Sequence, residues 1–227
     1  MPTGNSGWVS KSLAVFAKDI RLELRSRYAV NAILLFAVTT LAVVSFSVGQ
    51  ANLSPELLAA LFWVILLFSA VSGLAHSFVR EEETATALAL RLMADPEPIF
   101  VGKLLFNFAL LVLMAIIVTP LFFIFTDAAT QDWPTFLIVL PLGVVGLGSA
   151  TTLVAAIIAR ASVKGALFAV LSFPILIPLV LVLVSATDKV LDPNRSAGVG
   201  SEIQFLIAFP VVMITGSVLL FRFVWQE

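Results

Sequence analysis

Six long apolar stretches constrain this chain more than any other feature of its sequence. They cover residues 28–49, 57–79, 104–126, 135–159, 166–187 and 203–224. A helix needs about 20 apolar residues to cross the hydrocarbon core of a bilayer, where lipid offers the backbone no hydrogen-bond partner. Only 12% of the residues are charged, which is low for a water-soluble domain. The sequence therefore predicts an all-α, polytopic membrane protein with six transmembrane helices.

The basic residues are distributed unevenly between the two sides that these spans would define. One side carries those at positions 11, 18, 21, 25, 27, 80, 91, 103, 160, 164 and 222. The other side carries only Lys189 and Arg195. Because cytoplasmic segments are enriched in Lys and Arg, both termini are predicted to lie in the cytoplasm. The net charge of −1 gives no basis for binding nucleic acid.

Residues 1–27 form a predicted cytoplasmic segment ahead of the membrane domain at 28–227. Val9, Leu13, Phe16, Ile20 and Leu24 recur there at spacings of three and four, among several basic residues. This pattern predicts an amphipathic helix that lies along the inner membrane surface in contact with lipids. Such a helix can serve as a simple topology anchor or can also contact a partner protein, and the pattern leaves both open.

The second predicted cytoplasmic loop, residues 80–103, contains a helix that is too apolar to remain in water on all sides. Residues 81–83 are all glutamate and Arg91 lies near the end, as suits the helix dipole, with Ala and Leu between them. The segment Asp95-Pro96-Glu97-Pro98 is expected to end this helix. We expect residues 81–94 to lie on the membrane, to pack under the bundle, or to dock into another protein. Docking suits a transporter driven by an external ATPase, and an interfacial or re-entrant helix without a motor is the alternative.

Several segments in order along the chain carry a resemblance to a known family. They are Arg21-Leu22-Glu23-Leu24-Arg25, Leu61-Phe62-Trp63, Phe78-Val79-Arg80-Glu81-Glu82-Glu83, Gly102-Lys103 and Phe173-Pro174-Ile175-Leu176-Ile177-Pro178. Together they resemble CcmB, the permease of the cytochrome c maturation haem-export system, which is a permease of the ABC-2 type. The likeness covers nearly the whole chain, with matching length and span number. Ala85 departs from it, since a glycine is expected before a threonine in the coupling region.

The resemblance implies a permease subunit of an ABC transporter for haem export or delivery in c-type cytochrome biogenesis, in a bacterial inner membrane. The implied ATPase-coupling residues are Arg80, Glu81, Glu82, Glu83, Thr86, Leu88, Leu90 and Arg91. Arg21, Glu23 and Arg25 mark the interfacial helix. The implied partners are two copies of a cytoplasmic ABC ATPase, a second copy of this chain, a haem-handling membrane protein and a periplasmic haem chaperone.

Proline and small residues give two of the predicted spans an unusual character. Pro174 and Pro178 are four residues apart, hence on one helix face, and each removes an intrahelical donor. A kink in span five follows, either as a hinge that gates transport or as a static bend. Span four carries glycines at 143, 146 and 148, followed by small residues at four-residue steps. Small residues let helices approach closely, so span four is expected to be central in the bundle or at a dimer contact.

Absent motifs exclude several kinds of chemistry for this chain. It has no cysteine, no phosphate-binding loop around Gly102-Lys103, and no acidic residue inside a predicted span. We therefore expect no catalytic or metal site, ATP hydrolysis on a separate subunit, and no coupling to a driving ion. The predicted outer loops lack the usual axial ligands of haem, so haem is expected as a transported or delivered substrate rather than a bound cofactor. His76, the single histidine, is interpreted as an interfacial side chain with its hydrogen bonds satisfied, and haem ligation or proton relay is the alternative.

Two other functions remain open from the residues. One is an ABC-2-type permease that exports a lipid, a polysaccharide or a drug. Neighbouring genes would distinguish it, since glycan or resistance genes would replace those of a haem-handling partner and a haem chaperone. The other is a membrane scaffold that assembles other subunits without transport, which would bind partners without stimulating ATP hydrolysis.

Overall fold

The computed structural model describes residues 5–48, 53–74, 96–130, 132–158, 164–192 and 198–226, and every regular element in these ranges is an α-helix. The helices are α1 (Asn5–Ser26), α2 (Tyr28–Val48), α3 (Pro55–Leu74), α6 (Pro96–Thr126), α7 (Trp133–Ile158), α8 (Lys164–Leu191) and α9 (Gly200–Gln226). The predicted all-α class is thus confirmed for the described part of the chain.

Four of these helices are long and apolar enough to cross a membrane. They provide the segments Pro96–Thr126, Trp133–Ile158, Val170–Leu191 and Gly200–Phe221. Helices α2 and α3 coincide with the first two predicted spans, but their apolar runs among the described residues, Leu34–Phe46 and Pro55–Val71, are shorter. The chain is therefore a multi-pass membrane protein, and its first two spans stay predictions.

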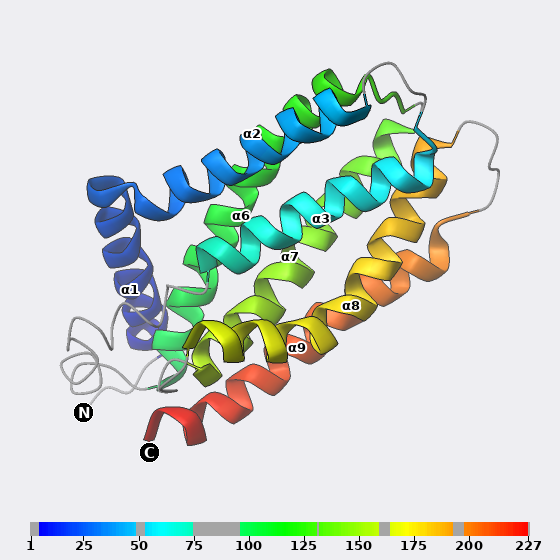
Figure 1. The fold of residues 1–227 in the computed structure, drawn as a ribbon. Coiled ribbons are helices and arrows are strands. Elements are labelled where there is room, and N and C mark those ends of the chain that lie inside the picture. Colours follow the sequence, from blue (N-terminus) through cyan, green and yellow to red (C-terminus); the bar gives the residue numbers. More distant parts are fainter. Residues whose placement is uncertain are drawn as a thin grey trace.

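The helices form one bundle with α1 placed across one end (Figure 1). The start of α1 and the end of α9 lie at this end, whereas α2 ends and α9 begins at the opposite end (Figure 1). Helix α7 contacts α3, α6, α8 and α9 and is the most buried of the four candidate spans, so it occupies the middle of the bundle. Helix α1 packs mainly against α6 and meets α2 at a sharp corner (Figure 1).

The glycines of α7 explain its central position. A Cβ atom on Gly143 would overlap the indole ring of Trp63, and one on Gly148 would lie 2.5 Å from Cδ1 of Phe108. On Gly146, a Cβ would lie 3.0 Å from the Leu179 side chain. Only residues without a side chain permit these approaches. The prediction that span four is central in the bundle is confirmed.

Two helices extend beyond the predicted spans. Helix α6 begins at Pro96 rather than at 104, so the predicted loop 80–103 ends earlier than expected. Gly102 and Lys103 lie inside the helix that they were expected to open. Prolines are well tolerated in the first turn of a helix, where no intrahelical partner awaits their missing N–H, so the prolines of this segment begin α6. Helix α8 continues to Leu191, which places Asp188 and Lys189 in a helix rather than in the predicted loop from 188 to 202.

Candidate functional site

The predicted ATPase-coupling residues lie in the segment 75–95, outside the described residues. They are Arg80, Glu81, Glu82, Glu83, Thr86, Leu88, Leu90 and Arg91, and His76 lies in the same segment. Helix α6 follows this segment directly at Pro96. The first turns of α6, and the side chains packed on them, are therefore the described structure closest in sequence to the predicted coupling element.

An ion pair joins α1 to these first turns of α6. Nζ of Lys103 lies 3.4 Å from Oδ2 of Asp19, and Lys103 is fully buried at 0% exposure. Asp19 is also buried, and its Oδ1 lies 3.1 Å from Nζ of Lys18 on the same helix. A charge removed from water this completely needs an opposite charge beside it. The contact between α1 and α6 is therefore built around Asp19 and Lys103.

Gly102, next to Lys103, sets how closely the two helices approach. A Cβ atom there would lie 2.7 Å from the backbone oxygen of Ser12 and 2.7 Å from Cβ of Val15. Backbone atoms of α1 cannot move aside as a flexible side chain would. Glycine at this position is thus a condition for bringing Asp19 within reach of Lys103.

Glu23 connects α1 to α2. Its Oε1 accepts a hydrogen bond of 3.0 Å from the backbone N–H of Val30, in the first turn of α2. A carboxylate at this place satisfies a backbone donor that has no intrahelical partner and favours the positive end of the helix dipole. Between the helices, Arg27 has a φ of 51°, which turns the chain through the corner. Glu23, predicted as an interfacial residue, is buried and holds this corner.

The remaining surface of α1 divides into an apolar and a basic part. The apolar side chains of Val9, Leu13 and Leu24 are 49%, 51% and 68% exposed, so they point away from the bundle. Arg21 and Arg25 are exposed as well. This division suits an amphipathic helix with one face toward lipid.

Both prolines of the predicted hinge lie inside α8, and both are exposed. Figure 1 shows α8 changing direction in its first half. Proline within a helix is a recognised cause of such a bend because it removes a hydrogen bond and crowds the preceding turn. The opposite side of this stretch packs against the bundle, since Leu176 is buried and the Phe173 ring contacts Phe68 of α3. A hinge role for Pro174 and Pro178 stays a prediction.

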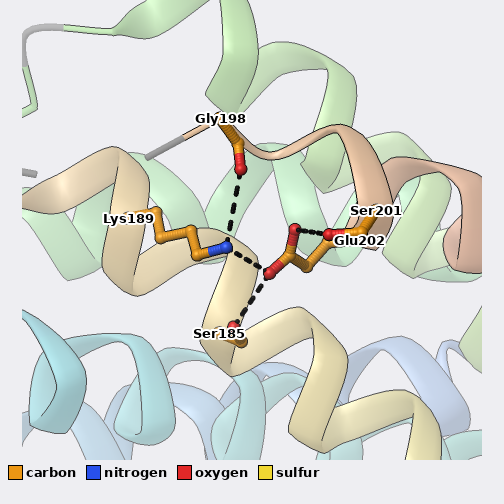
Figure 2. Close-up of polar contacts among 5 residues, drawn as sticks. All are labelled: Ser185, Lys189, Gly198, Ser201 and Glu202. Carbon is orange, nitrogen blue, oxygen red and sulfur yellow. Dashed lines mark hydrogen bonds and ion pairs between the residues drawn. The ribbon is translucent and has the colours of Figure 1, made fainter. Parts of the chain in front are cut away.

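A polar cluster at the opposite end of the bundle ties α8 to α9. The ammonium of Lys189 contacts the Glu202 carboxylate at 2.5 Å, and the hydroxyls of Ser185 and Ser201 donate to the same carboxylate at 3.1 and 2.9 Å (Figure 2). Lys189 also donates to the backbone oxygen of Gly198 at 3.5 Å. A groove of about 310 Å³ beside the pair is lined by Leu181, Val182, Ser185, Ser201, Glu202 and Phe205. The pair closes the end of the helical hairpin.

The described residues contain no group of three or more His, Cys, Asp or Glu side chains that could hold a metal ion. Among the described charged residues, the pairs Asp19–Lys103 and Lys189–Glu202 join helices at the two ends of the bundle.

Comparison with known families identifies the chain. The family model described as CcmB protein matches residues 10–224. The chain belongs to the CcmB family. The comparison with curated proteins finds no match. The matched range includes α1 as well as the bundle.

For this CcmB-family chain, sequence reasoning missed the partners of the ion pairs rather than the segments that carry them. A lysine directly before a long apolar run, such as Lys103, signals a carboxylate partner when the helix buries it, because a lone buried charge is costly. The residues Ser12, Val15, Asp19 and Glu23 recur at helical spacing and are all buried. That spacing marks a second face of α1, which the apolar pattern alone concealed. For Lys189 and Glu202, the signal was the placement of both residues beside the predicted fifth loop.

Proposed function

We propose that this chain is the membrane subunit of an ATP-driven haem exporter, coupled to a separate cytoplasmic ABC ATPase. The chain itself hydrolyses no ATP and holds no resident cofactor, and haem is its transported or delivered substrate. The observation that carries the proposal is the CcmB family match over residues 10–224. The buried joint between α1 and α6 supports it, since α6 continues directly from the predicted coupling segment.

The proposed complex contains two copies of this chain and two ATPase subunits, because ABC motors close as a pair. Closure would push residues 81–94 and alter the packing of α2, α3 and α8. We place both termini in the cytoplasm and the chain in a bacterial inner membrane. The common location of the start of α1 and the end of α9 agrees with this orientation (Figure 1).

Haem delivery requires further partners in this proposal. They are a haem-handling membrane protein and a periplasmic haem chaperone, which the CcmB family implies. Export of a lipid, a polysaccharide or a drug, and assembly without transport, are outcomes that the test below separates from haem delivery.

The test is purification of the tagged chain from its own membranes in mild detergent, with identification of the proteins that accompany it. We expect an ABC ATPase and a haem-handling membrane protein. An ATPase without a haem-handling protein would indicate a general exporter, and partners without permease-dependent ATP hydrolysis would indicate a scaffold. Absence of any ATPase would contradict the proposal.

A matched pair of variants locates the contact. Glu82→Lys with Glu83→Lys should reduce ATPase co-purification and cytochrome assembly, because the coupling segment would carry the wrong charge. Glu56→Lys is the control, since Glu56 is exposed in the first turn of α3 at the opposite end of the bundle. Equal ATPase recovery with both variants would sink the role assigned to residues 82 and 83.

A further inference from the structure

The pair of Asp19 and Lys103 occupies a special position relative to the predicted coupling segment. Lys103 is the eighth residue of α6, two turns after the segment ends, and its ammonium is fully buried against α1. We propose that this ion pair is the positioning link that makes α1 move together with the first turns of α6 during the ATPase cycle. The inference rests on the proposed function and deepens it by naming the residues that carry the motion.

Stability alone does not account for a buried charge at this place. Replacing a buried ion pair by apolar residues of similar volume is often neutral or stabilising. The reason is that both charges lose their hydration on folding, and their mutual attraction often does no more than offset this loss. Other contacts between the helices are already apolar, including Val15 of α1 with Ile99, Phe100 and Leu104 of α6 in one buried cluster. The charges add an attachment with a fixed direction to a contact that would hold without them.

The contact around the pair favours joint movement over sliding. The backbone of α1 lies against Gly102 so closely that even a methyl group would collide with it. Such interlocked surfaces shift between discrete arrangements and do not deform continuously. A push on the start of α6 is therefore passed to α1 as a whole.

Glu23 extends this link to the membrane domain. It lies one helical turn after Asp19 on the same buried face of α1, and its carboxylate caps the start of α2. Helix α2 in turn packs against α3 and α6. The path from the first turns of α6 through α1 to α2 therefore consists of two polar contacts, Lys103 with Asp19 and Glu23 with the Val30 N–H, at successive turns of α1.

The decisive experiment compares single and paired replacements in the complex of this chain with its ATPase, reconstituted in lipid. Asp19→Leu combined with Lys103→Met removes both charges of the pair, so neither is left buried without the other, and the fold should be about as stable as wild type. We expect ATPase co-purification to be retained and stimulation of ATP hydrolysis by the permease to fall about tenfold. Lys103→Arg, which keeps the charge, should preserve most of the stimulation.

A second pair of variants separates the helices without touching a charge. Gly102→Ala should lower stimulation in the same way, because its Cβ would push α1 away from α6. Gly216→Ala is the control, since nothing lies within 4 Å of a Cβ at that position of α9. Full stimulation in the double variant without charges would overturn the link while leaving the proposed function intact. A wild-type complex that contains no ATPase would overturn both.

Discussion

The indole Nε1 of Trp63 in α3 donates a hydrogen bond of 2.7 Å to the hydroxyl of Thr187 in α8, and both residues are buried. The same indole ring lies against Gly143 of α7, so three helices meet at one side chain. A tryptophan whose N–H is satisfied can be buried completely without an unpaired donor. Trp63 thereby fixes the depth at which α3, α7 and α8 pack together.

Gly143→Ala tests this junction. The added Cβ would overlap the Trp63 ring and lie 2.7 Å from Cδ2 of Leu183, so the ring must leave its place. We expect the free energy of unfolding to fall by about 1–3 kcal/mol, as is usual for an overpacked core. Thermal unfolding in detergent, followed by tryptophan fluorescence, measures it. Gly216→Ala, with an open surrounding, should be neutral or stabilising.

The polar contact between α6 and α7 predicts an asymmetry between its two partners. Asn107 Nδ2 donates to Thr152 Oγ1 at 2.8 Å, while Thr152 itself donates to the Gly148 carbonyl. The Oδ1 of Asn107 is buried and has no hydrogen-bond partner. Thr152→Val would strand the whole amide and should cost about 0.6–1.7 kcal/mol.

Asn107→Leu is the counterpart, because it removes the unpaired oxygen together with the amide donor. We expect it to be nearly neutral, since apolar replacement of a poorly satisfied group loses little. Comparing the melting temperatures of the two variants checks the asymmetry. A larger loss for Asn107→Leu than for Thr152→Val would contradict the assignment.

Removing the charge of Lys189 should loosen the hairpin of α8 and α9. Lys189→Met leaves the Glu202 carboxylate with hydroxyl and backbone N–H donors but no cation, and the expected loss of stability is roughly 1–3 kcal/mol. Exchanging the residues, as Lys189→Glu with Glu202→Lys, should restore part of the loss. Protease sensitivity of the loop between α8 and α9 gives the readout, and equal sensitivity of all three proteins would refute the role of the pair.

The cap on α2 should be measurable locally. Glu23→Ala removes the acceptor of the Val30 N–H and should destabilise the first turn of α2 by about 1 kcal/mol. Hydrogen exchange of the amides at the start of α2 should become faster. Arg25→Ala, an exposed change two residues away, is the control and should leave this exchange unaltered.

Replacing the prolines of α8 tests whether its bend acts as a hinge or is a static feature of the helix. Because Pro174 and Pro178 are exposed, replacing both by Ala should leave the fold intact and make α8 straighter. If the bend serves as a hinge, ATP hydrolysis that depends on transport should change in the reconstituted complex. Unchanged hydrolysis would leave the prolines as static features of the helix.

Apolar runs predicted the helices well, because the thickness of the hydrocarbon core sets the length of a spanning helix. The small residues of α7 predicted its central place, because they let neighbouring helices approach closely. Predicted boundaries failed at Pro96 and Lys189 for a common reason. The predicted spans end where charged residues appear, whereas a helix can continue through a charged residue that is solvated or has a partner. Lys103 pairs with Asp19 of α1 at 3.4 Å, and Lys189 pairs with Glu202 of α9 at 2.5 Å. Both lysines lie in helices that extend beyond the predicted spans.

Contacts across long sequence separations could not be predicted from the sequence alone. Of the predicted apolar face of α1, Val9, Leu13 and Leu24 point away from the bundle, whereas Phe16 and Ile20 pack against its core. The apolar pattern did not indicate that Asp19 and Glu23 would be turned to the bundle. Pairing of Trp63 with Thr187 joins residues 124 positions apart, which no local spacing encodes. Which distant residues pair in this way is decided only when the helices pack together.

The separation of Asp19 from Lys103 also sets an order of events during synthesis. These residues are 84 positions apart, so at 5–20 residues per second a ribosome needs roughly 4–17 s to supply the lysine after the aspartate. During that interval the carboxylate has no α6 to bury it, and α1 must wait at the membrane surface. Docking of α1 is consequently a late step of biogenesis, completed only after the third predicted span has begun to emerge.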